Sequence, residues 1–296
     1  MPGCLKKNLM RNVLLLCKIS AYQTYFRNQK NFPKHIRLQE NELERFQRTH
    51  VRHNQTIMEI ERVLAARGIR YRKATRKEAI DYSRYDCLMT VGGDGTFLEA
   101  AGQVSEQLIL GINSDPEWSV GRFCTAEGNN FSKVLDKILR NQYLPVALQR
   151  LRVRFKYQRL TICALNDLLI CHKNPAAMSR YCLTIKGFEE EQRSSGIWIA
   201  TAAGSTGAIH SAGGKVLVLT SKQLQYRPRE LYDGRRARYR LKGAVLAPSQ
   251  DIKIFSLMKD GAIYVDGFHH HYPFHFGDEV KVDRFPRPLN LIKVKP

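Results

Sequence analysis

The fold of this 296-residue chain is decided by one stretch, Val91-Gly92-Gly93-Asp94-Gly95-Thr96. It follows a short apolar run, residues 86–91, and it precedes residues 96–101, whose composition favours a helix. Three glycines in four residues permit a tight turn and let backbone N–H groups approach an anion closely. Asp94 in this turn can take a proton from a hydroxyl or help to place a metal. The alternative is an Asp-Gly turn whose glycines only satisfy the backbone.

The alternation of strands and helices continues on both sides of this stretch. An apolar run at Asn12–Cys17 predicts a first buried strand, because it is too short for a secretory signal. Helical spacing predicts a helix over residues 40–67, which ends at Gly68. A strand at Leu108–Asn113 and a helix over residues 130–141 follow. This order predicts an α/β unit with a mostly parallel sheet, in which ligands bind beyond the carboxyl ends of the strands.

The pattern changes after Pro145. Residues 150–157 alternate strictly between apolar and basic side chains, which predicts a half-buried strand with a cationic outer face. Further strands are predicted over residues 160–172, 181–186, 197–201, 252–256, 262–265 and 279–283. We therefore expect an N-terminal α/β domain over residues 1–145 and a β-rich domain over residues 146–296, whose last strand can return to the first domain.

Composition and charge limit the class of protein. Hydrophobic residues make up 43% of the chain, and Lys and Arg exceed Asp and Glu by 48 to 27, which gives a formal net charge of +21. No apolar stretch approaches the ~18 residues that a membrane-spanning helix needs. The charge predicts anionic partners such as phosphates, nucleic acid or an acidic surface. The seven scattered cysteines predict a reducing compartment, the cytoplasm or the matrix of an organelle.

Two further segments carry polar groups in apolar surroundings. Asn166 and Asp167 interrupt an apolar strand, so they either face a ligand or mark a bulge or an edge. Residues 200–214 form a loop rich in Ala, Gly and hydroxyl groups, which suits the close approach of a ligand better than a plain flexible loop does.

These segments, in this order, resemble the motifs of the NAD kinase family. The Gly-Gly-Asp-Gly-Thr loop alone is also found in diacylglycerol and sphingosine kinases, whereas the pair Asn166-Asp167 together with the 206–214 loop is specific. A late Asp266-Gly267 completes the set. The resemblance covers residues 86–296 and is strongest to the plant NADH kinase and mitochondrial NAD kinase branch. It implies a Rossmann-like α/β domain followed by a β-sandwich-like domain.

The resemblance also implies the activity, transfer of a phosphoryl group from ATP or polyphosphate to the adenosine ribose 2′-hydroxyl of NAD⁺ or NADH. Asp94 is the implied catalytic base, with Mg²⁺ bridging donor oxygens. Binding of NAD(H) and nucleotide is expected from the residues Gly92, Gly93, Asp94, Gly95, Thr96, Asn113, Asn166, Asp167, Arg193, Ser205, Thr206, Gly207, Ala208, Ser211 and Asp266. The family further implies a homodimer or homotetramer, and neither a membrane nor nucleic acid is an expected partner.

Some positions depart from the family pattern, among them Ser195, Ala202-Ala203, Ala208 and Phe268. These changes leave the choice between NAD⁺ and NADH open. The alternatives to an NAD(H) kinase are a lipid or sphingoid kinase that shares the glycine loop and a non-catalytic dinucleotide or nucleic-acid binder.

Two clusters lie outside the motifs. His269-His270-His271 is read as a hairpin surface rather than a metal site, because adjacent strand residues point to opposite faces. The basic tract at residues 235–240 is read as a solvated loop or an interface.

Overall fold

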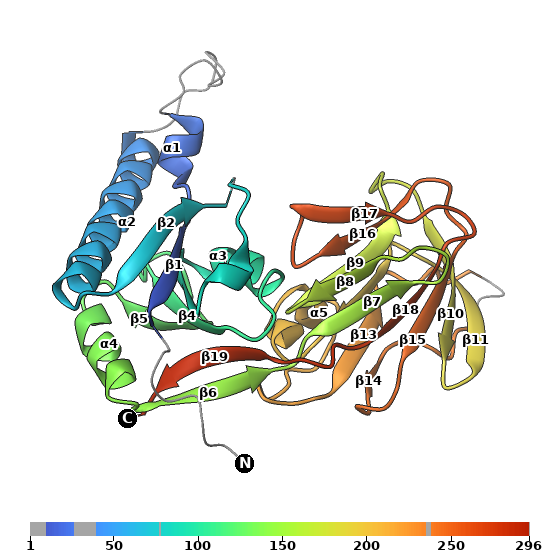
Figure 1. Ribbon diagram of the computed structural model, residues 1–296. Coiled ribbons are helices and arrows are strands. Elements are labelled where there is room, and N and C mark those ends of the chain that lie inside the picture. The colour runs from blue at the N-terminus through green and yellow to red at the C-terminus, as the bar shows by residue number, and fades with distance from the viewer. Residues whose placement is uncertain (1–9, 27–39, 77, 235–237, 296) are drawn as a thin grey trace. The chain divides into compact units, whose positions relative to one another are not determined.

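The computed structural model describes residues 10–26, 40–76, 78–234 and 238–295 (Figure 1). The chain divides into two compact units, residues 1–146 with 290–296 and residues 147–289. The first unit is therefore completed by the C-terminal segment of the chain. Part of the basic tract, residues 235–237, lies outside the described residues.

Within the described residues, the first unit is built on a seven-stranded sheet in the order β2-β1-β3-β4-β19-β6, with β5 paired to β4. Its strands are β1 (Asn12–Cys17), β2 (Arg70–Thr75), β3 (Cys87–Gly92), β4 (Leu108–Asn113), β5 (Cys124–Glu127), β6 (Tyr143–Leu148) and β19 (Leu289–Val294). Strand β1 pairs in parallel with both β2 and β3, and β4 pairs in parallel with β3, β5 and β19. The sheet is thus predominantly parallel, as the alternation of elements predicts.

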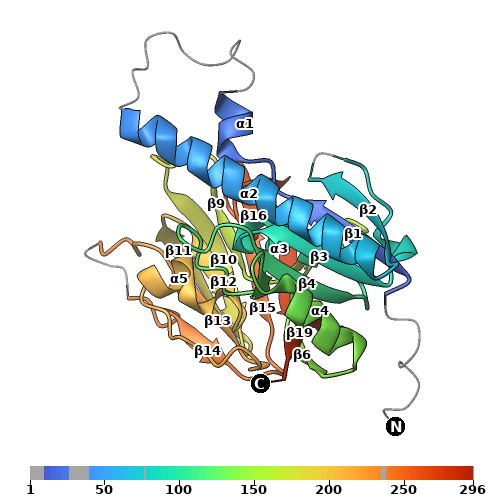
Figure 2. The ribbon, with the colours of Figure 1, turned by 90° about the vertical axis from the view of Figure 1, so that its left-hand side faces the viewer.

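Helices cover both faces of this sheet. They are α1 (Ala21–Tyr25), α2 (Glu40–Ala66), α3 (Asp94–Ala101) and α4 (Phe131–Leu139), with a short 3-10 helix η2 (Tyr82–Arg84). Helices α2 and α4 lie on one face of the sheet and α3 lies on the other (Figures 1 and 2). Ile60 and Leu64 of α2 are buried on the first face against alternate residues of β1 and β3, such as Leu15 and Met89. Phe97 of α3 is also fully buried. Burial on both faces explains why the central strands are almost continuously apolar.

The strand order places a topological switch point beside the glycine loop. From β1 the chain first adds β2 on one side and then β3 on the other side. Ligands of open α/β sheets bind at such a point, beyond the carboxyl ends of the two strands. Here those ends are Cys17-Lys18 after β1 and Gly92-Gly93 after β3.

The second unit consists of two antiparallel sheets of six described strands each, in the orders β11-β10-β15-β18-β7-β8 and β14-β13-β12-β9-β16-β17. The strands of the first sheet are β7 (Leu151–Phe155), β8 (Thr161–Ala164), β10 (Ser179–Ile185), β11 (Phe188–Ser194), β15 (Ile252–Ser256) and β18 (Glu279–Arg284). Those of the second are β9 (Asp167–His172), β12 (Ile197–Ala200), β13 (Leu224–Pro228), β14 (Ala244–Leu246), β16 (Gly261–Val265) and β17 (His270–Pro273).

The two sheets share one core. Val153 and Ile254 of the first sheet belong to the same buried cluster as Leu168, Ile199 and Ile263 of the second. This is the β-sandwich that the resemblance implies. A 3-10 helix η3 (Gly204–Thr206) and a single turn α5 (Ala208–Ser211) follow β12.

The structure corrects two details of the predicted strands. The run 160–172 is divided, because β8 ends at Ala164 and β9 begins at Asp167. Arg150 does not lie on a cationic outer face: it is buried, its guanidinium donates to the carbonyl of Arg287 at 2.9 Å, and it stacks over Phe285. The chain leaves the edge of the parallel sheet here, and a buried Arg that satisfies carbonyl groups is permitted where an unpaired charge is not.

Candidate active site

The glycine loop is shaped by contacts that leave no room for side chains. Strand β3 ends at Gly92, Gly93 is the N-cap, and α3 begins at Asp94. A Cβ atom on Gly92 would lie 2.3 Å from Oγ1 of Thr96, and one on Gly93 would lie 2.3 Å from Oγ of Ser119. Gly92 and Gly93 therefore cannot be replaced without moving a neighbour, whereas Gly95 is exposed and has open space beside it. Helix N-termini of this kind attract phosphate.

The carboxylate of Asp94 is held by two backbone N–H groups. Oδ2 accepts from N–H of Arg122 at 3.1 Å, and Oδ1 accepts from N–H of Phe123 at 3.0 Å. The ring of Phe123 is buried and stacks on Phe97 of α3, with ring centroids 5.0 Å apart. The Asp94 side chain is half-buried. Its direction is thus fixed by a second loop that is anchored to the same helix.

A lysine from the C-terminal strand supports this second loop. The ammonium of Lys293 in β19 donates to the carbonyl oxygen of Cys124 at 3.1 Å, directly after Phe123. Burial lowers the pKa of Lys293, and the negative charge of Asp94 acts in the opposite direction. Burial, reinforced by Asp94, raises the pKa of the Cys124 thiol to about 12. Lys293 therefore places a positive charge near Asp94 and holds the residue that follows the Arg122-Phe123 loop, which orients Asp94.

Asn113 performs a structural task in the same loop. Its side chain is buried, its Nδ2 donates to the carbonyl of Ser119 at 2.9 Å, and its Oδ1 accepts from N–H of Asp115 at 3.1 Å. A Cβ atom on Gly121 would lie 2.5 Å from this amide. Asn113 thus shapes the turn that carries Ser119 to the glycine loop.

In the second unit, the carboxylate of Asp266 binds the backbone of the segment that connects β8 and β9. Oδ2 accepts from N–H of Leu165 at 2.7 Å, and Oδ1 accepts from N–H of Asn166 at 2.7 Å and of Asp167 at 3.1 Å. The Asp266 N–H donates back to the carbonyl of Asp167 at 3.0 Å. Burial raises the pKa of Asp266 to about 6, although these three N–H groups act to lower it. Both carboxylate oxygens are therefore committed to the backbone.

Asp266 bonds to the backbone of Asn166 and Asp167, so the polar side chains of these two residues remain available to a ligand. Oδ1 of Asn166 is buried and has no hydrogen-bond partner among the described residues. Burial, with the nearby charge of Asp266, raises the pKa of Asp167 to about 7. A Cβ atom on Gly207 would lie 3.6 Å from Oδ2 of Asp167. An unsatisfied buried acceptor costs about 1–3 kcal/mol, so Asn166 is a candidate to receive a donor from a ligand.

The 200–214 loop packs directly on this pair. Oγ1 of Thr201 donates to the carbonyl of Leu165 at 2.6 Å, and a Cβ atom on Gly204 would lie 2.3 Å from the carbonyl oxygen of Asn166. Ser205 is fully buried, and its hydroxyl donates to the carbonyl of Ala202 at 2.7 Å. The exposed residues of the loop are Thr206, Gly207, Ala208, His210, Ser211 and Gly213. Ser205 therefore serves the loop itself, whereas the exposed residues can reach a ligand.

The structure thus forms two clusters, each inside one unit. The first contains the predicted residues of the glycine loop and Asn113, and the second contains those of the Asn166, Asp266 and Thr206 segments. Arg193 lies on the edge strand β11, where its described ionic contact is Glu191 at 3.8 Å, and the described residues give it no bond to either cluster. His270 and His271 lie in the exposed hairpin strand β17.

Sequence reasoning missed Lys293 and the loop at Arg122-Phe123. Nothing in the sequence around either position signals a site.

The described residues contain no group of three or more His, Cys, Asp or Glu side chains that could hold a metal ion by themselves. No described helix is both long and apolar enough to cross a membrane.

Solved structures with the same fold define the class. The chain superposes on an NAD kinase from Archaeoglobus fulgidus in complex with ATP with a TM-score of 0.68 at 20% identity, covering 96% of this chain and 93% of that chain. It superposes on yeast NADH kinase complexed with NADH with a TM-score of 0.71 at 16% identity, covering 98% and 85%. At these identities the likeness establishes the fold, and it confirms the predicted α/β domain followed by a β-sandwich.

Sequence relatives then establish the family. A model of the ATP-NAD kinase N-terminal domain matches residues 14–143. A probable NADH kinase of Oryza sativa subsp. japonica is 32% identical over 270 residues, which cover 81% of this chain and 83% of that protein. The NADH kinase of Arabidopsis thaliana is 32% identical over 264 residues with the same coverage. The chain belongs to the NAD kinase family, which is a family of phosphotransferases, and the predicted likeness to plant NADH kinases is confirmed.

Proposed function

We propose that this protein is an NAD(H) kinase, which transfers the terminal phosphoryl group of a donor to the adenosine ribose 2′-hydroxyl of NADH or NAD⁺. The observation that carries this proposal is the Asp94 carboxylate, fixed by two backbone N–H groups at the start of α3 in a glycine loop. Membership of the family supports the same reaction. A lipid substrate is disfavoured, because the relatives that span most of the chain are NADH kinases.

Asp94 acts on the acceptor hydroxyl. Its half-buried carboxylate orients the 2′-hydroxyl and takes the proton as the oxygen attacks the terminal phosphorus. The bond between that phosphorus and the bridging oxygen of the donor breaks, and the shortened donor leaves with the electron pair. Phosphoryl transfer depends mainly on positioning and on neutralising charge, so a carboxylate with a fixed direction is more important than a strong base.

The Asn166-Asp167 pair binds the dinucleotide. The unsatisfied Oδ1 of Asn166 accepts from a ribose hydroxyl or an amide of the ligand. Asp167, with a pKa of about 7, both donates and accepts near neutral pH. Thr206 and Ser211 add exposed hydroxyl groups from the neighbouring loop. Asp266 contributes by holding the backbone of the pair rather than by touching the ligand.

Mg²⁺ fits this arrangement as an ion carried by the donor. Magnesium keeps several waters and binds through one or two carboxylates together with substrate phosphates, so it does not need a cage of protein ligands. Asp94 is the carboxylate of the glycine loop that would reach it. When bound, the ion would neutralise charge on the donor oxygens.

A coupled assay tests the function directly. Purified protein is incubated with ATP, Mg²⁺ and either NADH or NAD⁺, and NADP(H) is measured with an NADP-specific dehydrogenase. We expect product with at least one acceptor, and a side-by-side comparison of kcat/KM fixes the preferred redox state. Absence of product with both acceptors, with ATP and with polyphosphate, would refute the proposal.

The assembly and compartment are also proposals. We expect a homodimer or homotetramer, which light scattering during gel filtration would measure. The cysteines in the described ranges are free thiols, several of them buried, which supports the cytoplasm or an organellar matrix.

A further inference from the structure

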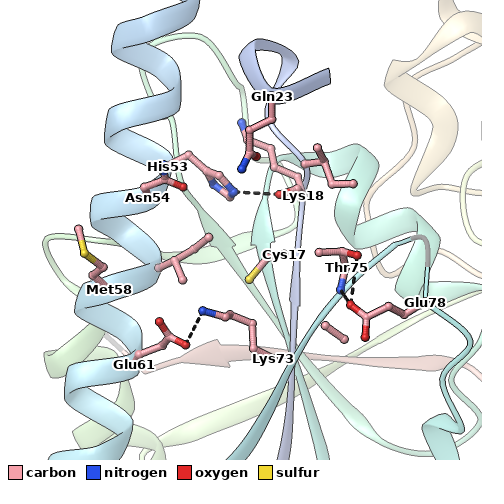
Figure 3. A pocket seen from close by; sticks show the side chains of 13 residues that line it. Cys17, Lys18, Gln23, His53, Asn54, Met58, Glu61, Lys73, Thr75 and Glu78 are labelled. Carbon is pink, nitrogen blue, oxygen red and sulfur yellow. Dashed lines mark hydrogen bonds and ion pairs between the residues drawn. The ribbon is translucent and has the colours of Figure 1, made fainter. Parts of the chain in front are cut away.

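A buried histidine of α2 joins two strand ends on either side of the glycine loop. The Nε2 atom of His53 lies 3.0 Å from the carbonyl oxygen of Lys18, directly after β1, and its Nδ1 lies 2.9 Å from Oγ of Ser114, directly after β4. Figure 3 shows the ring pointing from α2 toward Lys18, beside a cavity of about 800 Å³ at this end of the sheet. The ring therefore connects a helix to two strands of the sheet that it covers.

Strand β3, which ends in the glycine loop, lies between these two strand ends. The N–H of Lys18 donates to the carbonyl of Val91 at 3.0 Å, and the N–H of Ser114 donates to the carbonyl of Gly92 at 3.1 Å. Neighbouring strands are about 4.8 Å apart, so β1 and β4 are about 10 Å apart across β3. His53 thus spans the last two residues of β3, at the point where the glycine loop begins.

The two partners of His53 fix its tautomer. A carbonyl oxygen only accepts, so Nε2 carries the proton and donates to Lys18. Burial lowers the pKa of His53 to about 4, and the charge of Lys18 acts in the same direction, so the ring is neutral at neutral pH. The other nitrogen of a neutral ring is an acceptor, and Nδ1 therefore accepts from the hydroxyl of Ser114. Both nitrogens are thus committed to holding neighbouring residues.

Arg52, the preceding residue of α2, holds the next position of the same loop. Its Nη1 donates to Oδ1 of Asp115 at 2.7 Å, and its Nη2 donates to the carboxylate of Glu117. Asp115 is buried, and its carbonyl accepts from the N–H of Ser119 at 2.9 Å. The helix therefore holds the loop after β4 at two consecutive residues, Ser114 and Asp115.

The far end of this loop orients Asp94. Residues 113–123 lead from the end of β4 to Arg122 and Phe123, whose N–H groups bind the Asp94 carboxylate. Because the loop is held at both ends, a shift of Ser114 would change the direction of these N–H groups. Misplacing a reacting group by about 1 Å can lower turnover by about 100-fold.

We infer that His53 is a positioning residue for phosphoryl transfer: it ties Ser114 to the end of β1 and so keeps the 113–123 loop in the place from which it directs Asp94. The inference deepens the proposed kinase function and rests on it. It gives α2, which the sequence predicts only as a helix, a part in turnover. His53 acts through the loop rather than on the reacting atoms, since its two ring nitrogens are bound to Lys18 and Ser114.

Removing both hydrogen bonds separates positioning from binding. His53→Phe keeps a ring of similar size, and we expect kcat to fall at least tenfold while KM for NADH changes less than twofold, because the acceptor-binding groups around Asn166 lie in the second unit. His50→Phe, one turn earlier on α2, is the matched control. It loses a similar contact, between Nδ1 and Oγ of Ser20 at 2.9 Å, and kcat should stay within twofold of wild type.

Two conservative variants show which bond carries the effect. Oδ1 of an asparagine takes the place of Nδ1, and Nε2 of a glutamine takes the place of the ring Nε2. His53→Asn therefore retains the bond to Ser114, and His53→Gln retains the bond to Lys18. We expect His53→Asn to recover kcat to within threefold of wild type and His53→Gln to remain as slow as His53→Phe. Adding Ser114→Ala to His53→Gln should cause no further loss.

Melting temperatures are measured for the same proteins. A role in stability alone predicts wild-type kcat in every variant that is folded at the assay temperature, and that result would overturn the inference. Recovery of kcat by His53→Gln but not by His53→Asn would also overturn it. If wild type phosphorylates no acceptor, it is the kinase proposal that fails; an active wild type whose turnover is insensitive to His53 refutes the positioning role alone.

The tautomer gives a readout that does not depend on turnover. Long-range ¹H–¹⁵N NMR of wild-type protein, with the His53 signals assigned by their absence in His53→Gln, should show the proton on Nε2 and no titration between about pH 5.5 and 8. A proton on Nδ1, or titration near the ordinary histidine pKa of about 6.5, would refute the two hydrogen bonds on which the inference depends.

Discussion

Two aspartates, one in each unit, have carboxylates that accept hydrogen bonds from backbone N–H groups. The two differ in how much of the carboxylate remains uncovered. Asp94 accepts two backbone N–H groups from Arg122 and Phe123, and Asp266 accepts three from residues 165–167. Asp94 lies at the start of a helix with its carboxylate only half-buried, so part of it can meet a substrate. Asp266 has both oxygens committed to the backbone. We therefore propose that a carboxylate bound by N–H groups can serve catalysis where part of it stays uncovered, and that it serves the backbone alone where it does not.

The largest expected effect is on turnover. Asp94→Asn keeps the shape and an acceptor oxygen but removes the charge and the ability to take a proton. We expect kcat to fall by about 10³-fold or more, while the melting temperature stays within a few degrees of wild type. Coupled assays and thermal unfolding measure the two quantities. Retention of more than a tenth of wild-type kcat would remove Asp94 from the chemistry.

Asp266→Ala tests the second aspartate of this comparison, which we expect to act on stability rather than on turnover. It leaves three N–H groups of the 165–167 segment without their acceptor, so we expect a loss of about 3 kcal/mol in the free energy of unfolding and a large rise in KM for NADH. Urea unfolding and steady-state kinetics are the measurements. Asp266→Asn, which keeps one acceptor oxygen, should lie between the alanine variant and wild type. An alanine variant as stable as wild type would show that the hydrogen bonds of Asp266 to residues 165–167 do not stabilise the fold.

Lys293 tests whether Asp94 depends on its supporting loop. Lys293→Met removes the hydrogen bond to Cys124 and a nearby positive charge, and we expect kcat to fall about tenfold with KM for ATP and NADH within twofold. Lys293→Arg should recover most of the loss. An unaltered kcat in a folded Lys293→Met variant would leave Lys293 with no part in positioning.

The last expected effect concerns stability and its dependence on pH rather than turnover. The pKa of Asp167 is about 7 in the folded protein against an ordinary value near 4, so its protonation stabilises the fold below pH 4, and this contribution is lost as pH rises through 7. Asp167→Asn cannot ionise and should therefore gain stability relative to wild type between pH 4.5 and 8, on the order of 2 kcal/mol. Urea unfolding at several pH values measures this. A difference that does not change with pH would contradict the raised pKa.

The sequence predicted elements well where their pattern was local. The strands at Asn12–Cys17, Leu108–Asn113 and Ile252–Ser256 have the predicted bounds, because buried runs and strict alternation depend only on neighbours in the chain. Strands β2 (RYRKAT) and β11 (FEEEQRS) were missed, because their charged side chains hide the pattern. Both are edge strands, where charge guards against pairing with another chain.

In the candidate site, too, the sequence revealed the residues of local motifs and missed those brought there from distant parts of the chain. Asp94 and its glycines were evident from the sequence, because a turn between a strand and a helix demands those residues within a few positions. The groups that orient Asp94 were not, since Arg122 and Phe123 are about thirty residues away and Lys293 comes from the strand that closes the sheet near the C-terminus.

The sequence by itself thus determined an α/β domain followed by a β-rich one, a glycine loop between a strand and a helix, and a resemblance to NAD kinases. The tertiary structure alone decided that Asp266 acts on the backbone of the Asn166 segment and that Lys293 supports Asp94. The physical reason is that periodicity and turn chemistry are properties of neighbouring residues. Hydrogen bonds between residues a hundred or more positions apart exist only after the strands have paired and the core has excluded water.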